Sequence, residues 1–243
     1  IEEAEELLRW VSAFDFPDFD VDYEYVSLRH ESEYPFNEGR IVSNRGLDID
    51  ASEFEQNFHE HHVKRSNALH CYLRKNDSYL VGPMARFHNN FDQLSPRARQ
   101  AAEEQGLSQN CFNPFRGIQV RGVELIYALD EAWRIIDHYQ KPEKAFRELD
   151  ARGVSGCAVT EAPRGILYHR YEIDDEGQIS FAKIVPPTSQ NQRMIELDLE
   201  ALVTRYIDLD DEQLQWRCEQ AIRNYDPCIS CATHFLKLDV ERG

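Results

Sequence analysis

Hydrophobic positions along the chain follow two spacings, one typical of helices and one typical of strands. Near the start, Leu7, Leu8, Val11 and Phe14 recur as on one face of an amphipathic helix. The helical spacing, read with capping residues and breakers, predicts helices over residues 2–14, 51–62, 96–105, 115–139, 191–207 and 210–225, and a short one ending at 149.

The strand pattern is an alternation of apolar and polar residues over four to eight positions. It predicts strands at residues 23–28, 39–43, 79–81, 158–160, 166–173 and 179–185. The turn at 174–177 has the Asp and Gly content of a hairpin connection. Helices and a mostly antiparallel sheet, unevenly segregated along the chain, indicate an α+β fold rather than a wound parallel sheet.

Composition narrows the classes of function. The chain has 243 residues, enough for a sizeable core, and 27 Lys and Arg against 44 Asp and Glu give a net charge of −17. Such acidity disfavours a nucleic-acid partner, because the short basic clusters at 64–65 and 97–99 form no patch. No stretch approaches the roughly 18 consecutive apolar residues of a membrane span.

The ends of the sequence and its thiols suggest its origin. Residues 2–6 are too acidic for a signal peptide, and Ile1 opens directly into a helix pattern, so we expect a piece of a longer protein. The six cysteines are too few and too unevenly spaced for a secreted disulfide scaffold. We therefore expect reduced thiols and a cytoplasmic location.

The sharpest motif lies near the C-terminus. Cys228, Cys231 and His234 recur every three residues, which puts three groups able to bind a metal on one face of one or two turns. Asp226 and Pro227 look like a helix N-cap and first helical residue. Cys228 would then lie in the first turn, where the helix dipole favours the thiolate that binds metal.

Other interpretations of this motif remain open. A redox pair would need a strand-to-helix context, and the element before it is helical. A structural zinc site needs four ligands, so Cys218 or another histidine would have to complete the set. Two further motifs occur upstream, a tight corner at 161–165 that projects a single arginine and a second corner at 186–191 that opens a helix.

Taken together, these motifs resemble a known family. Residues 161–165 followed by His169, then 187–191, then Asp-Pro-Cys-x-x-Cys-x-x-His at 226–234, are similar to the C-terminal half of the large subunit of nickel–iron hydrogenases, especially the cytosolic cofactor-reducing multisubunit group. The segment 81–86 also resembles the middle of that family. The resemblance implies reversible cleavage of H2, with electrons passed to an iron–sulfur small subunit and further electron-transfer subunits.

The resemblance also implies metal ligands and processing. Cys228 matches the terminal nickel ligand and a base for the released proton, and Cys231 matches a thiolate bridging nickel to an iron that carries one CO and two cyanides. His234 matches a magnesium ligand and the mature C-terminus. The tail 235–243, beginning with Phe235, would be a propeptide removed by a maturation endopeptidase after nickel chaperones deliver the metal.

Five residues around the metal receive roles in the same way. Arg164 matches a guanidinium above the open metal position, and Asp226 matches a carboxylate that orients it through a bidentate pair. Thr188 matches a hydroxyl that hydrogen-bonds a cyanide, and Pro163 and Pro187 match the walls of the ligand pocket.

One departure from the family is serious. The first cysteine pair of the family, in Arg-x-Cys-Gly-x-Cys, is absent, so the chain holds half of a site and should be inactive and free of metal in isolation. Two alternatives are therefore kept: a zinc-stabilised interaction module, and a relative of a respiratory complex I subunit without nickel. Residues 59–62 contain three histidines but no H-E-x-x-H motif; on a helix His59 and His62 would share a face, and we expect solvated or packed side chains there. Trp10, Trp133 and Trp216 are expected in the core or at a subunit interface.

Overall fold

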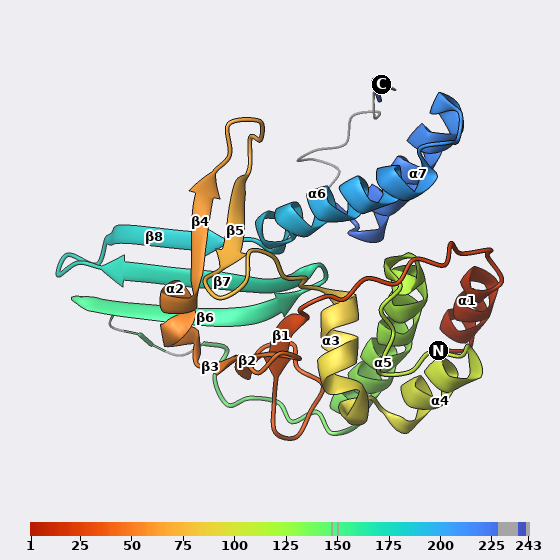
Figure 1. The fold of residues 1–243 in the computed structure, drawn as a ribbon. Coiled ribbons are helices and arrows are strands. Elements are labelled where there is room, and N and C mark those ends of the chain that lie inside the picture. Colours follow the sequence, from red (N-terminus) through yellow and green to blue (C-terminus); the bar gives the residue numbers. More distant parts are fainter. Residues whose placement is uncertain (147, 150, 228–237, 242–243) are drawn as a thin grey trace.

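The α+β prediction is confirmed by a computed structural model, which describes residues 1–146, 148–149, 151–227 and 238–241 (Figure 1). The α-helices are α1 Glu2–Ser12, α2 Phe54–Asn57, α3 Pro83–Asn90, α4 Pro96–Glu104, α5 Gly117–Asp137, α6 Pro187–Tyr206 and α7 Asp211–Asn224. Short 3-10 helices are η1 Ala51–Glu53, η2 Phe91–Gln93 and η3 Pro114–Arg116. The strands are β1 Val26–Arg29, β2 Arg40–Ser43, β3 Asp48–Ile49, β4 Phe58–His62, β5 Leu69–Leu73, β6 Val154–Ala162, β7 Gly165–Ile173 and β8 Ile179–Val185.

The strands form three small antiparallel sheets, in the orders β1-β2-β3, β4-β5 and β6-β7-β8. Helices α1, α3, α4 and α5 pack together at one side of the molecule, and the long β6-β7-β8 sheet extends away from them (Figure 1). One buried cluster joins the helices to the N-terminal segment, and a second fills the space where the three sheets meet. No helix in the described part of the chain combines the length and apolarity of a membrane span.

The predicted helix over 51–62 is wrong in its second half. Asp50 caps the start, with a capping box to Glu53, but the helical segment ends at Asn57. Residues 58–62 instead form β4, because Phe58 is buried against Phe54 and the strand pairs along its whole length with β5. Tertiary pairing therefore overrides the helical spacing of the histidine-rich segment.

Other differences lie at the margins. The strand expected at 79–81 makes an isolated bridge, from Leu80 to Tyr25, and the described residues of 141–149 contain no helix. Trp10, Trp133 and Trp216 are 62%, 70% and 59% exposed, so they do not lie in the core. Their alternative place, at an interface with another subunit, remains a prediction.

A buried arginine connects helices α3 and α5 to strand β6. Arg86 of α3 is 2% exposed, and its guanidinium donates to Glu124 of α5 at 2.7 and 2.8 Å and to Glu161 of β6 at 2.9 Å. It also donates to the carbonyl oxygens of Ala162 and Pro163 at 2.8 and 3.0 Å. Burial opposes its charge, but the two carboxylates raise the pKa of Arg86 well above its usual value. We call Arg86, Glu124 and Glu161 the buried charge cluster.

Replacing Arg86 should therefore destabilise the fold strongly. In Arg86→Met two buried carboxylates lose their partner, and we expect a loss of about 3–5 kcal/mol in the free energy of unfolding. Urea unfolding of the purified protein measures this. The matched control is Arg40→Met, because Arg40 forms an exposed pair with Asp48 and its loss should leave the urea midpoint unchanged. Equal midpoints for the two variants would contradict a structural role for the buried charge cluster.

Candidate functional site

The turn that carries Arg164 is held in a close crossing of two backbones. Ala162 pairs with Gly165, so Pro163 and Arg164 form a two-residue connection between β6 and β7, as the sequence predicted. A Cβ on Gly165 would lie 2.4 Å from the Val81 side chain, and one on Gly82 would lie 2.7 Å from the Arg164 carbonyl oxygen. Both glycines have positive φ, of 133° and 114°, so the crossing requires glycine on each side.

Arg164 reaches from this turn to the end of α7. Its Nη2 lies 3.4 Å from Oδ2 of Asp226, and its Nε donates to the backbone carbonyl of Asp226. The two residues therefore meet as expected, but through one carboxylate oxygen and one carbonyl rather than a bidentate carboxylate pair. Asp226 has a φ of 47° and is the single non-glycine residue with positive φ in the described part of the chain.

The start of α6 joins the same site through side-chain amides. Asn191 accepts from the backbone N–H of Val81 at 2.9 Å and donates to the carbonyl of Val81 at 3.1 Å. Gln190 is fully buried and donates to the carbonyl of Ile166 at 2.7 Å. These contacts fix the 81–82 segment and β7 to the helix that begins with Pro187.

A buried carboxylate fixes the residue before Asp226. Asp198 of α6 accepts from the hydroxyl of Tyr225 at 2.6 Å and from that of Tyr23 at 2.5 Å. Burial raises the pKa of Asp198 to about 6, although the two tyrosine hydroxyls favour its charged form. The segment leading to Cys228 is thereby attached to α6 and to the N-terminal part of the chain.

A cavity of about 30 Å³, enough for one or two waters, lies where these segments converge. Its wall includes Arg164, Tyr225, Val81 and Asn191, together with Arg121 of α5. Arg121 donates to the carbonyl of Asn224 at 3.1 Å, and burial lowers the pKa of Arg121 while Asp226 opposes that effect. Two arginines therefore contribute to the wall of one small, largely apolar space.

The remaining expected site residues divide into two groups. Pro187 is buried, Thr188 is half-buried and Pro163 is exposed, and none of the three lines this cavity. Cys228, Cys231, His234 and Phe235 lie outside the described residues. Within the described residues no three His, Cys, Asp or Glu side chains are grouped so as to hold a metal ion. His169 lies within hydrogen-bonding distance of Tyr171, at 3.0 Å between its Nδ1 and the phenol oxygen.

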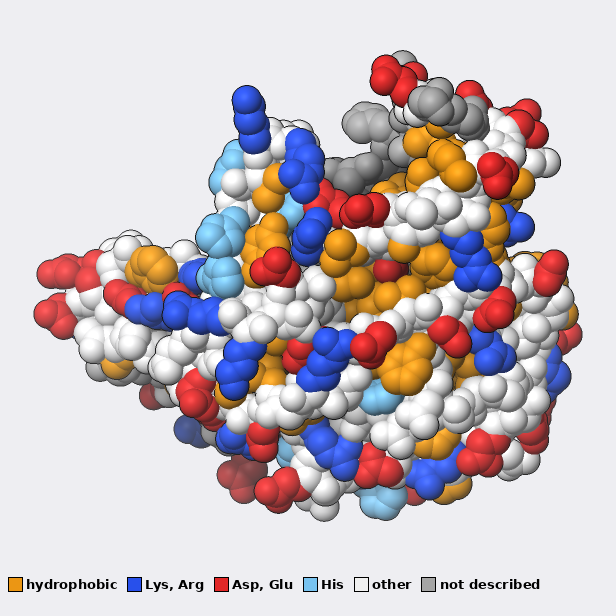
Figure 2. All heavy atoms as spheres, in the orientation of Figure 1, with side chains coloured by type: hydrophobic (Ala, Val, Ile, Leu, Met, Phe, Trp, Pro, Cys, Tyr) orange, Lys and Arg blue, Asp and Glu red, His pale blue; other side chains and the backbone are white. Residues whose placement is uncertain are grey.

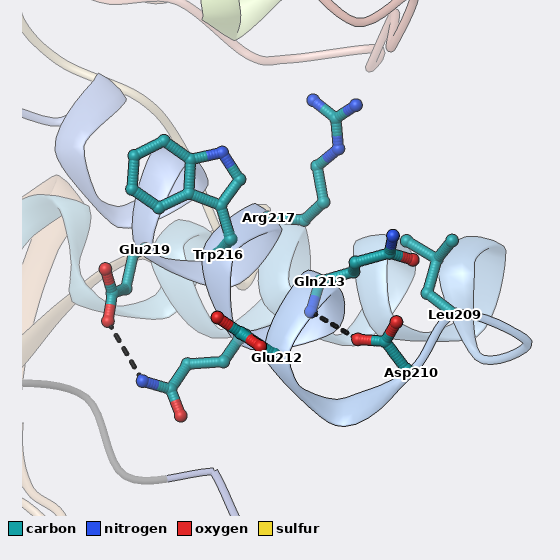
Figure 3. A pocket seen from close by; sticks show the side chains of 8 residues that line it. Leu209, Asp210, Glu212, Gln213, Trp216, Arg217 and Glu219 are labelled. Carbon is teal, nitrogen blue, oxygen red and sulfur yellow. Dashed lines mark hydrogen bonds between the residues drawn. The ribbon is translucent and has the colours of Figure 1, made fainter.

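A wider hollow of about 740 Å³ on α7 does not have the character of a site (Figure 3). Its side chains point in different directions around the helix, with the Trp216 ring and the Arg217 guanidinium at the top of the view. The hydrogen bonds drawn there are contacts three or four residues apart along the helix, from the Gln213 backbone N–H to Asp210 at 2.8 Å and from Gln215 to Glu219 at 3.2 Å. The hollow is the ordinary surface of α7.

Sequence reasoning missed the residues that support the site. Arg86, Glu124 and Asp198 are charged residues on the buried faces of helices, and Arg121 is the second guanidinium of the cavity. The signal in the sequence was a charge within an apolar helical stripe, as at Glu124 between Val123 and Tyr127. This pattern indicates that the charged side chain is buried, but it does not identify the residue that pairs with it. The pairing residues come from distant segments of the chain.

Comparisons with known proteins show the family of the chain. A family model described as nickel-dependent hydrogenase matches residues 117–234. Sulfhydrogenase 1 subunit alpha of Pyrococcus furiosus is 30% identical over 200 residues, which cover 82% of this chain and 46% of that protein. The NAD-reducing hydrogenase HoxS subunit beta of Cupriavidus necator is 30% identical over 174 residues, which cover 67% of this chain and 35% of that protein. The chain belongs to the nickel-dependent hydrogenase family.

Solved structures show the same fold. An NAD+-reducing NiFe hydrogenase in the H2-reduced state matches with a TM-score of 0.72 at 24% identity, over 96% of this chain and 56% of that chain. A NiFeSe hydrogenase variant from Desulfovibrio vulgaris Hildenborough matches with a TM-score of 0.64 at 19% identity, over 95% of this chain and 57% of that chain. The chain thus spans about half the length of these proteins, and half or less of the curated relatives.

The buried Asp198 should give the protein a specific pH dependence. The pKa of Asp198 is about 6 in the folded state and 3.8 in the unfolded chain. The free energy of unfolding should therefore fall as pH rises from below 3.8 to above about 6. Each pKa unit corresponds to about 1.4 kcal/mol, so the loss is on the order of 3 kcal/mol. In Asp198→Asn this fall in the free energy of unfolding should be absent. Urea unfolding between pH 3.5 and 7.5 measures it.

Glu196 on the same helix provides a control of opposite sign. Its hydrogen bond with Arg65 lowers the pKa of Glu196, so its contribution appears as pH rises and is lost at acid pH. Glu196→Gln should therefore remove a gain in stability with rising pH rather than a loss. If the free energy of unfolding of Asp198→Asn changes with pH as that of the unsubstituted protein does, the pKa of Asp198 is not raised in the folded state.

Proposed function

We propose that this chain is the C-terminal half of a nickel–iron hydrogenase large subunit. The observation that carries the proposal is Arg164, held on a rigid turn and paired with Asp226 at the point where the Asp-Pro-Cys-x-x-Cys-x-x-His segment begins. Membership of the family and the second arginine, Arg121, in the wall of the same cavity support it. Cys228, Cys231 and His234 would hold nickel, the iron with its CO and two cyanides, and magnesium.

The donor chemistry of the chain suits such a group. Thiolates are the ligands that soft metals prefer, and the chain supplies two of them with the required spacing. The cavity beside Arg164 is small and mainly apolar. A guanidinium such as that of Arg164 would complement an anionic cyanide. When bound, the nickel–iron group would supply the centre at which H2 is cleaved heterolytically.

The residues of this chain would act as fixed charges and as a base. Arg164 would hold its guanidinium over the substrate without reorganising, because the turn that carries it is fixed by Arg86. Asp226 would orient that guanidinium. Cys228 would accept the proton on its sulfur, with Thr188, Pro163 and Pro187 around the diatomic ligands.

The proposal includes partners that lie outside this chain. A second cysteine pair from an Arg-x-Cys-Gly-x-Cys segment is needed to complete the metal site, so this chain by itself is proposed to be inactive. Electrons would pass to an iron–sulfur small subunit and electron-transfer subunits in the cytoplasm. The tail 235–243 would be removed after nickel insertion by the maturation endopeptidase.

Arg164 provides the test of catalysis. In the complete, metal-loaded enzyme, Arg164→Lys keeps the charge but loses the planar guanidinium, and we expect H2 oxidation with an artificial acceptor to fall about 10²- to 10³-fold. Nickel and iron contents should stay unchanged. The control is Arg170→Lys on β7, the strand that follows Arg164; its guanidinium pairs with Glu55, and the variant should keep full activity. Unchanged activity in Arg164→Lys would contradict the catalytic assignment.

Metal analysis of the chain separates this proposal from a zinc module. The chain purified with excess Zn2+ should hold no ion in a closed tetrahedral sulfur–nitrogen site, because Cys218 is buried in a core with Phe19 and Leu214 and is not free to be a fourth ligand. X-ray absorption at the zinc edge measures the ligand set. One tightly bound zinc with four such ligands would favour the interaction module.

A further inference from the structure

The β4–β5 hairpin carries a group of histidines on an exposed part of the surface. Figure 2 shows pale blue side chains gathered over this hairpin. Alternate residues of a strand point to opposite faces, so His59 and His61 lie on one face of β4 and His62 lies on the other. A helix would instead have paired His59 with His62. The strand therefore creates a pair that helical spacing does not contain.

The geometry of this pair matches two ligands of one ion. The ring centroids of His59 and His61 are 4.7 Å apart and the rings are perpendicular. With metal–nitrogen bonds of about 2.1 Å and a nitrogen–metal–nitrogen angle near 90–110°, two imidazoles on one ion have centres about 4.6–5.3 Å apart. The separation of the two ring centres falls within this range.

No hydrogen bond among the described residues occupies the Nδ1 atom of His59. This atom is buried, and no contact there fixes the tautomer of the ring. The ring of Tyr72 on β5 stacks against His59 at 5.8 Å and lies 5.4 Å from His61, supporting both rings from the neighbouring strand.

We propose that His59 and His61 form a two-imidazole site for a divalent first-row transition-metal ion such as Zn2+, with water in its other positions. Imidazole nitrogen selects such ions over Mg2+ and Ca2+, which prefer oxygen. His70 lies opposite His61 in the strand register but is 1% exposed, so its ring is withdrawn from the surface and the site has two protein ligands. The site is separate from the Arg164 cavity and does not depend on the proposed hydrogenase activity.

Zinc binding by register variants tests the site. The background is Cys228→Ser with Cys231→Ser, which removes the thiolates of the C-terminal motif. Zn2+ affinity is measured by competition with a chromophoric chelator. His59→Gln and His61→Gln should each weaken binding at least about tenfold, while His62→Gln on the opposite face should change it less than about twofold. Mg2+ at the same concentrations should not compete.

Thermal unfolding gives a second readout that needs no catalytic activity. An ion that binds the folded state raises its stability, so Zn2+ should raise the midpoint in the background protein and in His62→Gln but not in His59→Gln or His61→Gln. Midpoints without Zn2+ show whether each variant is folded. Equal Zn2+ affinity in all three variants, or a loss confined to His62→Gln, would overturn the proposal.

Discussion

The structure depends on the buried charge of Arg86. Its guanidinium meets carboxylates from two other elements and the carbonyls of two turn residues, so it links α3, α5 and the β6–β7 hairpin at one point. Burial raises the pKa of Glu161 to about 7, but Arg86 opposes this and Glu161 also accepts from the Leu28 N–H at 2.8 Å. An arginine buried in this way is stable when its donors are satisfied, and five such contacts satisfy it.

This anchoring explains why Arg164 can be only half-buried and still well placed. The carbonyl of the residue just before it is bonded to Arg86, and the residue just after it is a glycine pressed against Val81. On the other side, Tyr225 is tied to Asp198 immediately before Asp226. The Arg164–Asp226 pair is thus supported from both ends by buried polar contacts, as electrostatic preorganisation requires.

The same chain shows how an element type decides which side chains meet. The hairpin histidines are spaced for a helix face, yet their segment pairs with β5 and presents His59 and His61 together. Trp133 and the apolar residues at the end of α5 are likewise exposed because the last turns of that helix extend beyond the core, and Trp10 is exposed because it lies off the buried face of α1. In each case local spacing was compatible with two outcomes and packing selected one.

The sequence by itself determined the fold class, the β6–β7 corner with its single arginine, and the order of the motifs, because turns and helix starts depend on residues close together in the chain. It could not determine the buried charge cluster or the Asp198 contacts with Tyr23 and Tyr225, since these join residues 27 to 175 positions apart. Nor could it choose between helix and strand for 58–62. Those outcomes depend on pairing and burial between distant segments, which are decided by the tertiary structure.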